Sequence, residues 1–263
     1  MRVIDFHTHA FPDYLAAKAV PFLEAEADVK ASTNGTIAAL LASMDKAGVE
    51  SSVICSIATK PAQFSPILEW SRSIASSRLI PFASVHPDDA DMIARVKTVQ
   101  DAGLKGIKMH PYYQRYTLND PRLNPFYEAV SSAGLVLVAH TGFDIAYPRD
   151  RIADPDKIAA VVSRFPDLKL VATHLGAWED WDQVEKRLLG REIYMEISYT
   201  LSILPDERVV SMLNRHPADY LLFGTDCPWD DQKRALTHFL SLPLSDALKE
   251  KMLFTNARRL LGL

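Results

Sequence analysis

The 263-residue sequence lacks several features that would fix a protein's class at once. Its two cysteines, Cys55 and Cys227, are too few for a disulfide framework. No glycine-rich phosphate loop follows the first apolar run. No apolar stretch is long enough to span a bilayer, which argues against a membrane protein. The formal net charge is only -4 and no block of like charges occurs, so the composition predicts no nucleic-acid partner.

The chain also lacks signs of targeting or of division into parts. No basic segment followed by an apolar one opens the sequence, because Met1 leads directly into an apolar run. We therefore expect a cytoplasmic protein. No Gly/Ser linker or low-complexity segment interrupts the chain, and 48% of its residues are hydrophobic, enough for a sizeable core. Residues 1–263 are expected to form a single domain.

Short apolar runs alternate with helical patterns along the whole sequence. Strands are expected at residues 3–6, 52–57, 79–85, 104–109, 135–139, 168–172, 193–197 and 220–223. Helices are expected at residues 36–48, with Thr33 or Asn34 as cap, and at 61–77, 88–102, 123–133, 154–165, 181–189, 205–215, 231–240 and 245–261. Eight strand–helix units predict a (β/α)8 TIM barrel, slightly elaborated by an extra segment at residues 12–33. An open doubly wound sheet is the alternative, and the missing phosphate loop speaks against it.

Histidines gather where the predicted strands end. The protein has eight histidines, and six stand at the carboxyl ends of these strands: His7, His9, His86, His110, His140 and His174. Only His216 and His238 fall elsewhere. Because a TIM barrel carries its active site at the carboxyl ends of its strands, the distribution predicts that these side chains share one site.

The residue types suggest a metal centre. His7 and His9 are two apart on a strand, so their side chains point the same way. His140, His174 and Asp226 end three further strands. Imidazole and carboxylate ligands suit Zn, with Mn, Fe, Co or Ni as alternatives. Taken singly, each residue fits a hydrogen-bonded turn or a helix cap, and only the combination favours a metal. Cys227 follows Asp226 directly and is expected to point away.

These positions resemble the amidohydrolase superfamily. Three further segments are similar to its amidohydrolase-related branch: Lys-Gly-Ile-Lys-Met-His-Pro at 105–111, Phe-Gly-Thr-Asp-Cys-Pro at 223–228 and Asn-Ala-Arg-Arg-Leu-Leu-Gly at 256–262. That branch holds TIM-barrel metal-dependent hydrolases and decarboxylases similar to aminocarboxymuconate-semialdehyde decarboxylase. The resemblance covers the whole chain.

The resemblance implies one divalent ion held by the set His7, His9, His140 and Asp226. It also implies catalytic roles for Asp226, which would take a proton from the reactive water, and for His174, which would act as a base or polarise that water. In other branches a carboxylated lysine on strand four bridges two ions. Lys108 stands on the expected fourth strand, so a binuclear site is the alternative.

Several further residues are candidates for substrate binding. Lys108, His110 or Arg149 could bind a substrate carboxylate, although Lys108 could equally pair with a buried acid and Arg149 could be solvated. Tyr112 and Trp229 could wall a pocket or pack between loops. Glu196 is expected either behind a ligand histidine or in a buried salt bridge. The expected partner is a small molecule bearing a carboxylate.

The expected function is hydrolysis of a small amide, ester or lactone by a metal-activated water. The alternative is non-oxidative decarboxylation of an unsaturated or aromatic acid at the same metal site. The compact chain favours the hydrolase, because the decarboxylases of this branch usually carry larger insertions. A third hypothesis is a barrel that has lost activity and serves as a binding protein. The presence of all five site residues argues against it, because such a protein need not keep them. The resemblance is compatible with a homo-oligomer.

Overall fold

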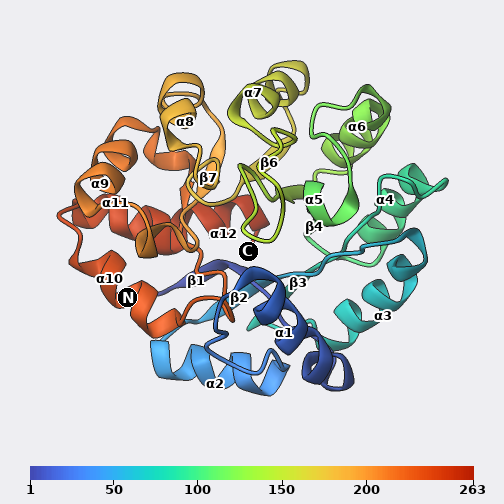
Figure 1. The fold of residues 1–263 in the computed structure, drawn as a ribbon, viewed down its shortest axis with the longest axis horizontal. Helices are drawn as coiled ribbons and strands as arrows, with labels where there is room; N and C mark the ends of the chain where they lie inside the picture. Colours follow the sequence, from blue (N-terminus) through green and yellow to red (C-terminus); the bar gives the residue numbers. More distant parts are fainter.

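The computed structural model describes all 263 residues and contains eight parallel strands with helices between them. The strands are β1 (Ile4–Thr8), β2 (Ser51–Cys55), β3 (Leu79–Phe82), β4 (Gly106–Met109), β5 (Val136–Ala139), β6 (Lys169–Ala172), β7 (Tyr194–Glu196) and β8 (Leu221–Leu222). Every expected strand is present. Figure 1 shows the helices arranged in a ring around the strands. The predicted (β/α)8 barrel is confirmed.

Hydrogen bonding divides the strands into two ladders that meet at both edges. One ladder runs β1-β2-β3 and the other runs β4 to β8 in sequence order. Isolated parallel bridges join β3 to β4 at Ala83 and Ile107, and β1 to the end of β8 at Thr8 and Cys227. The carboxyl ends of all eight strands therefore face the same side of the molecule.

The expected helices are also present, with three corrections to their ends. They are α2 (Ile37–Ala47), α3 (Phe64–Ile74), α4 (Met92–Asp101), α6 (Asn124–Ser132), α7 (Pro155–Arg164), α8 (Trp181–Arg187), α9 (Asp206–Arg215), α10 (Gln232–Ser241), α11 (Asp246–Glu250) and α12 (Asn256–Leu261). Short 3-10 segments lie at η1 (Pro61–Gln63), η2 (Pro121–Leu123), η3 (Thr200–Ser202) and η4 (Ala218–Tyr220). No helix combines the length and the apolar composition that crossing a membrane requires.

The corrections have local causes. The cap of α2 is Thr36, whose hydroxyl accepts the Ala39 N–H, while Asn34 accepts the N–H of Thr36 itself. Helix α4 begins at Met92 rather than at residue 88, because Asp89 instead accepts the N–H of Asp91 in a turn. The last predicted helix is interrupted by a π-helical turn at Lys251–Thr255.

Two helices lie where no helix was expected. Helix α1 (Asp13–Ala27) occupies the extra segment after β1, and only Ala16 and Val20 of its residues are buried. Helix α5 (Pro111–Gln114) follows β4 and is capped by the His110 side chain. Both stand at the carboxyl ends of strands, where they border the functional side of the barrel.

Apolar side chains fill two layers of the barrel. The larger cluster lies between the strands and the surrounding helices and includes Leu40, Val99 and Leu213. A second cluster combines strand residues such as Phe6 and Phe82 with residues of α12. Each fully buried phenylalanine stabilises the fold by about 1.5–3 kcal/mol. The two layers hold the strand ends rigidly in place.

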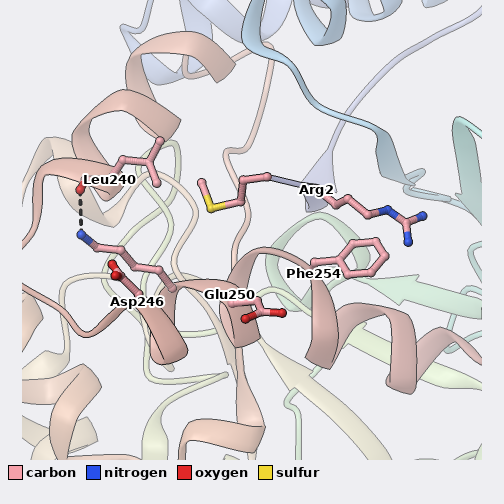
Figure 2. A pocket seen from close by; sticks show the side chains of 7 residues that line it. Arg2, Leu240, Asp246, Glu250 and Phe254 are labelled. Carbon is pink, nitrogen blue, oxygen red and sulfur yellow. Dashed lines mark hydrogen bonds between the residues drawn. The ribbon is translucent and has the colours of Figure 1, made fainter.

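A small hollow of about 550 Å³ lies where the chain starts, beside the C-terminal helices (Figure 2). Both of its basic side chains already have partners. Lys249 donates to the Leu240 carbonyl at 2.7 Å, and Arg2 binds Glu50 at 2.7 Å while lying 3.9 Å from the centre of the Phe254 ring. It is at the end of the barrel opposite the strand carboxyl ends, where residues serve stability.

Candidate active site

A cavity of about 1390 Å³ opens at the carboxyl ends of the strands. All six histidines that were predicted to stand at strand ends line it, together with Lys108, Asp226 and Trp229. The barrel thus brings together residues from β1, β4, β5, β6 and β8 that are up to about two hundred residues apart in sequence.

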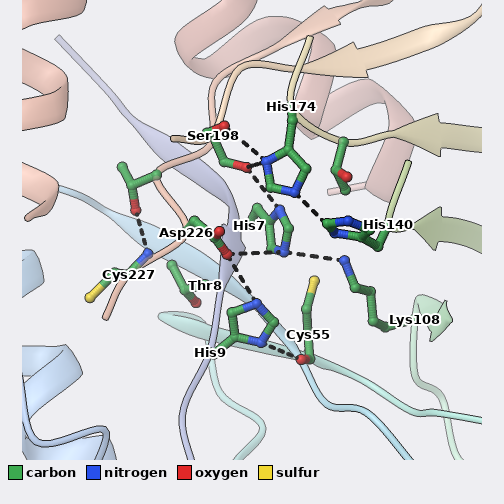
Figure 3. Close-up of polar contacts among 12 residues, drawn as sticks. His7, Thr8, His9, Cys55, Lys108, His140, His174, Ser198, Asp226 and Cys227 are labelled. Atoms are coloured by element: carbon green, nitrogen blue, oxygen red, sulfur yellow. Dashed lines mark hydrogen bonds and ion pairs between the residues drawn. The ribbon is translucent and has the colours of Figure 1, made fainter. Parts of the chain in front are cut away.

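His7, His9 and Asp226 form the tightest group of potential metal ligands. The Oδ1 atom of Asp226 lies 3.0 Å from Nε2 of His9 and 3.4 Å from Nε2 of His7. The side chains point toward one another across the seam between β1 and β8 (Figure 3). The three ligand atoms all lie within 4.8 Å of one another, close enough to share one ion.

Hydrogen bonds on the far side of each imidazole fix its orientation. Nδ1 of His7 lies 2.9 Å from the Glu196 carboxylate and 3.1 Å from the Ser198 hydroxyl. Nδ1 of His9 lies 2.8 Å from the carbonyl oxygen of Cys55. A carbonyl oxygen only accepts, so His9 carries its hydrogen on Nδ1, and the Glu196 carboxylate favours the same tautomer for His7. Both Nε2 lone pairs are left for a ligand, as in known metal sites.

The charges and spacing of this group fit a divalent ion. Burial, followed by the Lys108 charge, holds the pKa of His7 well below its usual range, so His7 is neutral as a metal ligand must be. Burial raises the pKa of Asp226, but His7 and His9 outweigh it and hold that pKa well below its usual range. Oδ1 of Asp226 is buried without a hydrogen-bond partner of good geometry. Ligand atoms about 2.1 Å from a tetrahedral ion lie about 3.4 Å apart, close to the distances found here.

His140 and His174 supply a second sign of a cation-binding site. Nε2 of His140 lies 2.9 Å from the Phe143 carbonyl, and Nδ1 of His174 lies 3.0 Å from the Ser198 carbonyl, so these two atoms carry the hydrogens. The remaining nitrogens, Nδ1 of His140 and Nε2 of His174, then face each other at 3.2 Å with lone pairs. Burial is the first cause that lowers both pKa values to about 3, and the second cause is His110 for His140 and His140 for His174, so no proton separates the two nitrogens at neutral pH. A cation at this place would relieve the repulsion.

Lys108 is buried in the cavity wall without a carboxylate partner. Its side chain is 1% exposed, and its Nζ donates to Nε2 of His7 at 3.2 Å. No acidic group lies within 4.0 Å of it. The alternative of a buried ion pair for Lys108 therefore does not hold. A buried ammonium of this kind favours an anion in the cavity.

A second group of potential ligands, His110, His140 and Asp144, lies beside the first. Oδ2 of Asp144 is 3.4 Å from Nε2 of His110 and 3.6 Å from Nε2 of His140. Despite burial, His110 and His140 hold the pKa of Asp144 far below its usual range. Sequence reasoning missed Asp144, which lies in an irregular loop. Its position four residues after His140 was the available signal.

Two residues that the sequence suggested for substrate binding, Arg149 and Tyr112, do not line the cavity. Arg149 pairs with Glu179 and lies 4.2 Å from the centre of the Phe143 ring, outside the cavity lining. The Tyr112 hydroxyl donates to the carbonyls of Gly142 and Asp150, also outside the lining. Tight loop packing rather than a pocket accounts for both. Tyr113 lines the cavity instead.

The other side chains near the site behave as structural groups. Cys227 is fully buried outside the cavity lining, as expected, and burial raises the pKa of its thiol to about 12. Trp181 is buried and donates from Nε1 to the His174 carbonyl at 3.0 Å. Glu196 lies behind His7, one of the two placements expected for it.

The turns that present two site residues have unusual backbones. His174 has φ 57° and Asp226 has φ 70°, both in the left-handed region. The His174 turn is held by the Glu196 carboxylate, which accepts the His174 N–H at 3.1 Å. A Cβ on Gly224 would lie 2.4 Å from Glu196 Oε2, so only glycine fits there.

Comparisons with known proteins agree with this geometry. Residues 4–263 match the sequence model of the family described as Amidohydrolase. No curated protein matches the chain by sequence. An uncharacterized TIM-barrel protein from Bordetella bronchiseptica has a TM-score of 0.79 at 23% identity, covering 100% of this chain and 99% of that one.

Two further solved structures carry named activities. A dihydroxybenzoic acid decarboxylase from Polaromonas sp. JS666, with bound manganese and the inhibitor 2-nitroresorcinol, has a TM-score of 0.71 at 14% identity and covers 99% of this chain and 97% of its own. A proposed 2-pyrone-4,6-dicarboxylic acid hydrolase from Pseudomonas putida has a TM-score of 0.66 at 17% identity, with coverage of 99% and 97%. At these identities the likeness establishes the fold.

Proposed function

The chain belongs to the amidohydrolase family, and on this basis we propose that it is a metal-dependent hydrolase of a small amide, ester or lactone. The observation that carries the proposal is the convergence of His7, His9 and Asp226 within 4.8 Å, with His140 and His174 in the same cavity. The proposed ligands of one divalent ion are His7, His9, His140 and Asp226.

Neutral imidazoles and an ionised carboxylate suit zinc, with manganese, iron, cobalt or nickel as alternatives. When bound, a divalent ion would polarise a substrate carbonyl and make water acidic enough to attack near neutral pH. Metal binding at Nε2 of His7 would replace the hydrogen bond that this atom accepts from Lys108 at 3.2 Å. The Lys108 ammonium would then turn toward the cavity. A second ion bridged by carboxylated Lys108 is the alternative.

The proton transfers are assigned to two residues. Asp226 is ionised and its Oδ1 accepts no well-formed hydrogen bond, so it can take a proton and pass it to the leaving group. His174 is neutral, and its Nε2 lone pair faces Nδ1 of His140 in the cavity. It can therefore orient the attacking water. Glu196 fixes the imidazole of His7 and Ser198 fixes that of His174. These contacts limit the reorganisation that the reaction requires.

Substrate recognition is assigned to Lys108, His110 and Trp229. The unpaired ammonium of Lys108 favours a substrate that bears a carboxylate. His110, held against Asp144, and Trp229 line the same cavity. Arg149 and Tyr112 are left out because their polar groups are engaged elsewhere.

Non-oxidative decarboxylation of an unsaturated or aromatic acid is the second candidate. The structural likeness to a dihydroxybenzoic acid decarboxylase supports it. The same ion and the same Lys108 could hold such an acid. The reactions differ in product, since a decarboxylase releases carbon dioxide whereas a hydrolase releases a carboxylate without it.

Elemental analysis combined with two activity assays tests the proposal. We expect about one divalent ion per chain, lost in the double variant His7→Ala with His9→Ala and kept in the control His238→Ala, whose imidazole binds Asp206 away from the cavity. A protein that never takes up metal would overturn the proposal. Carbon dioxide release from unsaturated or aromatic acids, without hydrolysis of esters, amides or lactones, would select the decarboxylase.

For Lys108→Gln we expect kcat/KM for a carboxylate-bearing substrate to fall about 10- to 100-fold, because a charge-assisted contact of about 1.5–3 kcal/mol is lost. Uncharged substrates should be little affected. An equal loss for both classes would mean that Lys108 does not recognise the carboxylate.

A further inference from the structure

The cavity continues beyond the metal ligands into an apolar groove between α1 and α3. Its apolar side chains are Leu15, Ala19, Phe22 and Leu23 of α1 on one side and Pro66, Ile67 and Trp70 of α3 on the other, and Glu26, Glu69 and Ser73 also line it. The histidines and Lys108 line its other end. One continuous space thus has a polar, reactive end and an apolar end.

The apolar side chains of α1 follow the helical repeat. Leu15, Ala19, Phe22 and Leu23 are spaced by three or four residues, so they form one stripe. A neighbouring pair, Ala16 and Val20, is buried, whereas Leu15 and Phe22 of the stripe are exposed. The stripe is therefore not the buried side of the helix.

The rim of the cavity, which includes part of the stripe, carries an unusual share of the exposed apolar side chains. The structure has nine exposed large apolar side chains, and four of them border this cavity: Tyr14, Leu15, Phe22 and Ile145. Phe22 is 61% exposed. Gathered apolar surface of this kind marks a binding site.

The volume indicates a ligand larger than a single ring. Pockets for small molecules usually measure about 300–1,000 Å³, and this cavity measures about 1390 Å³. A molecule that occupies only the polar end would leave the α1 stripe in water. A ligand that reaches both ends must carry a polar head and an apolar extension.

We propose that the groove between α1 and α3 binds an aliphatic chain of the substrate. The substrate class is then an amphiphilic carboxylic acid derivative, with its reacting carbonyl at the metal ligands and its chain along α1. This inference rests on the proposed function for the position of the carbonyl. The groove is concave and opens into the reactive cavity, which favours one molecule spanning both parts over a second copy of the chain.

Binding of straight-chain carboxylates to the metal-free protein tests the inference without catalysis. Three of the four tryptophans, Trp70, Trp178 and Trp229, line the cavity, so intrinsic fluorescence can report binding. From about four to about twelve carbons, the Kd should fall about fourfold for each added methylene, which corresponds to about 0.8 kcal/mol. A Kd that does not depend on chain length would overturn the inference.

The variant Phe22→Ala tests whether the aliphatic chain of the ligand lies along α1. Because Phe22 is mostly exposed, its loss should leave the fold intact, while the Kd of the longest carboxylate rises about tenfold and that of the shortest is unchanged. The matched control is Ile93→Ala in α4, 51% exposed and outside the cavity. Equal behaviour of the two variants would overturn the inference. So would a change of oligomeric state in Phe22→Ala without a change in Kd, which would assign the stripe to a second copy.

Rates with p-nitrophenyl esters of the same acids separate the two proposals. Hydrolysis at rates independent of chain length would retain the proposed function and reject the groove. Chain-dependent carboxylate binding without any hydrolysis would retain the groove and reject the hydrolase.

Discussion

Replacing Glu196 by glutamine should weaken metal binding without removing a metal ligand. The carboxylate of Glu196 is fully buried and accepts four hydrogen bonds: from Nδ1 of His7 at 2.9 Å, from the His174 N–H at 3.1 Å, and from the Ser198 N–H and hydroxyl at 2.6 and 2.9 Å. A glutamine has one oxygen, and with that oxygen at the Oε1 position, where three of the donors meet, its NH2 group must face the Ser198 N–H. His7 then loses its charge-assisted hydrogen bond and keeps only a neutral acceptor.

The expected magnitude follows from the bond that is lost. A hydrogen bond to a charged group contributes about 1.5–3 kcal/mol, which corresponds to about a tenfold to hundredfold change in an equilibrium constant. Partners behind metal ligands have effects of the same size on metal affinity. We therefore expect the Kd for Zn²⁺ in Glu196→Gln to rise about 10- to 100-fold.

Competition with a chromophoric chelator measures this Kd, and activity at saturating metal supplies the second readout. If Glu196 acts by positioning His7, excess metal should restore most of the activity. Glu192→Gln is the control, because Glu192 lies two residues before β7 and accepts only from the Tyr220 hydroxyl. An unchanged Kd in Glu196→Gln would refute the reasoning.

Two further predictions concern stability. Burial chiefly lowers the pKa of His110 to about 4 from its ordinary 6.5, so its contribution is complete above pH 6.5 and is lost as pH falls toward 4. Urea unfolding with a chelator should show a loss of about 2 kcal/mol from this group between pH 7 and pH 5, and His110→Gln should remove that part of the slope. If the free energy of unfolding depends on pH equally in the unmodified protein and in His110→Gln, His110 is not the source of the loss. In Gly142→Ala, at φ +89°, the new Cβ would lie 2.0 Å from the Trp178 nitrogen, so unfolding should require about 3 kcal/mol less free energy. Gly134→Ala, at φ +68° with open space, should lose only about 1 kcal/mol, and equal losses would contradict the steric argument.

The barrel could be predicted because its strands carry strong local signals. Apolar runs such as Val136–Ala139 are buried on both faces and read as strands from composition alone. The histidines could be placed for the same reason, since each ends such a run. Helix α1 could not be placed, because only Ala16 and Val20 of its residues are buried, Pro21 stands inside it, and its apolar stripe faces the cavity instead of the core.

The site was predicted as a set of residues but not as a set of contacts. Backbone partners such as the Cys55 carbonyl, which orients His9, leave no trace in a residue pattern. Asp144 sits in an irregular loop, where no periodicity indicates the direction of a side chain. Arg149 was predicted to bind a substrate because it is a cation in the loop after β5, but it pairs with Glu179. The residue pattern does not show such a competing partner.

The left-handed backbone at His174, Leu175 and Asp226 implies a trade-off between the proposed activity and thermal stability. Each non-glycine residue held there costs about 1–3 kcal/mol, a large share of the roughly 5–15 kcal/mol by which a domain is usually stable. Selection for heat tolerance alone would therefore favour glycine or asparagine at these positions, including His174 and Asp226, to which the proposed proton transfers are assigned. Stabilised forms of this enzyme must gain their stability elsewhere in the barrel.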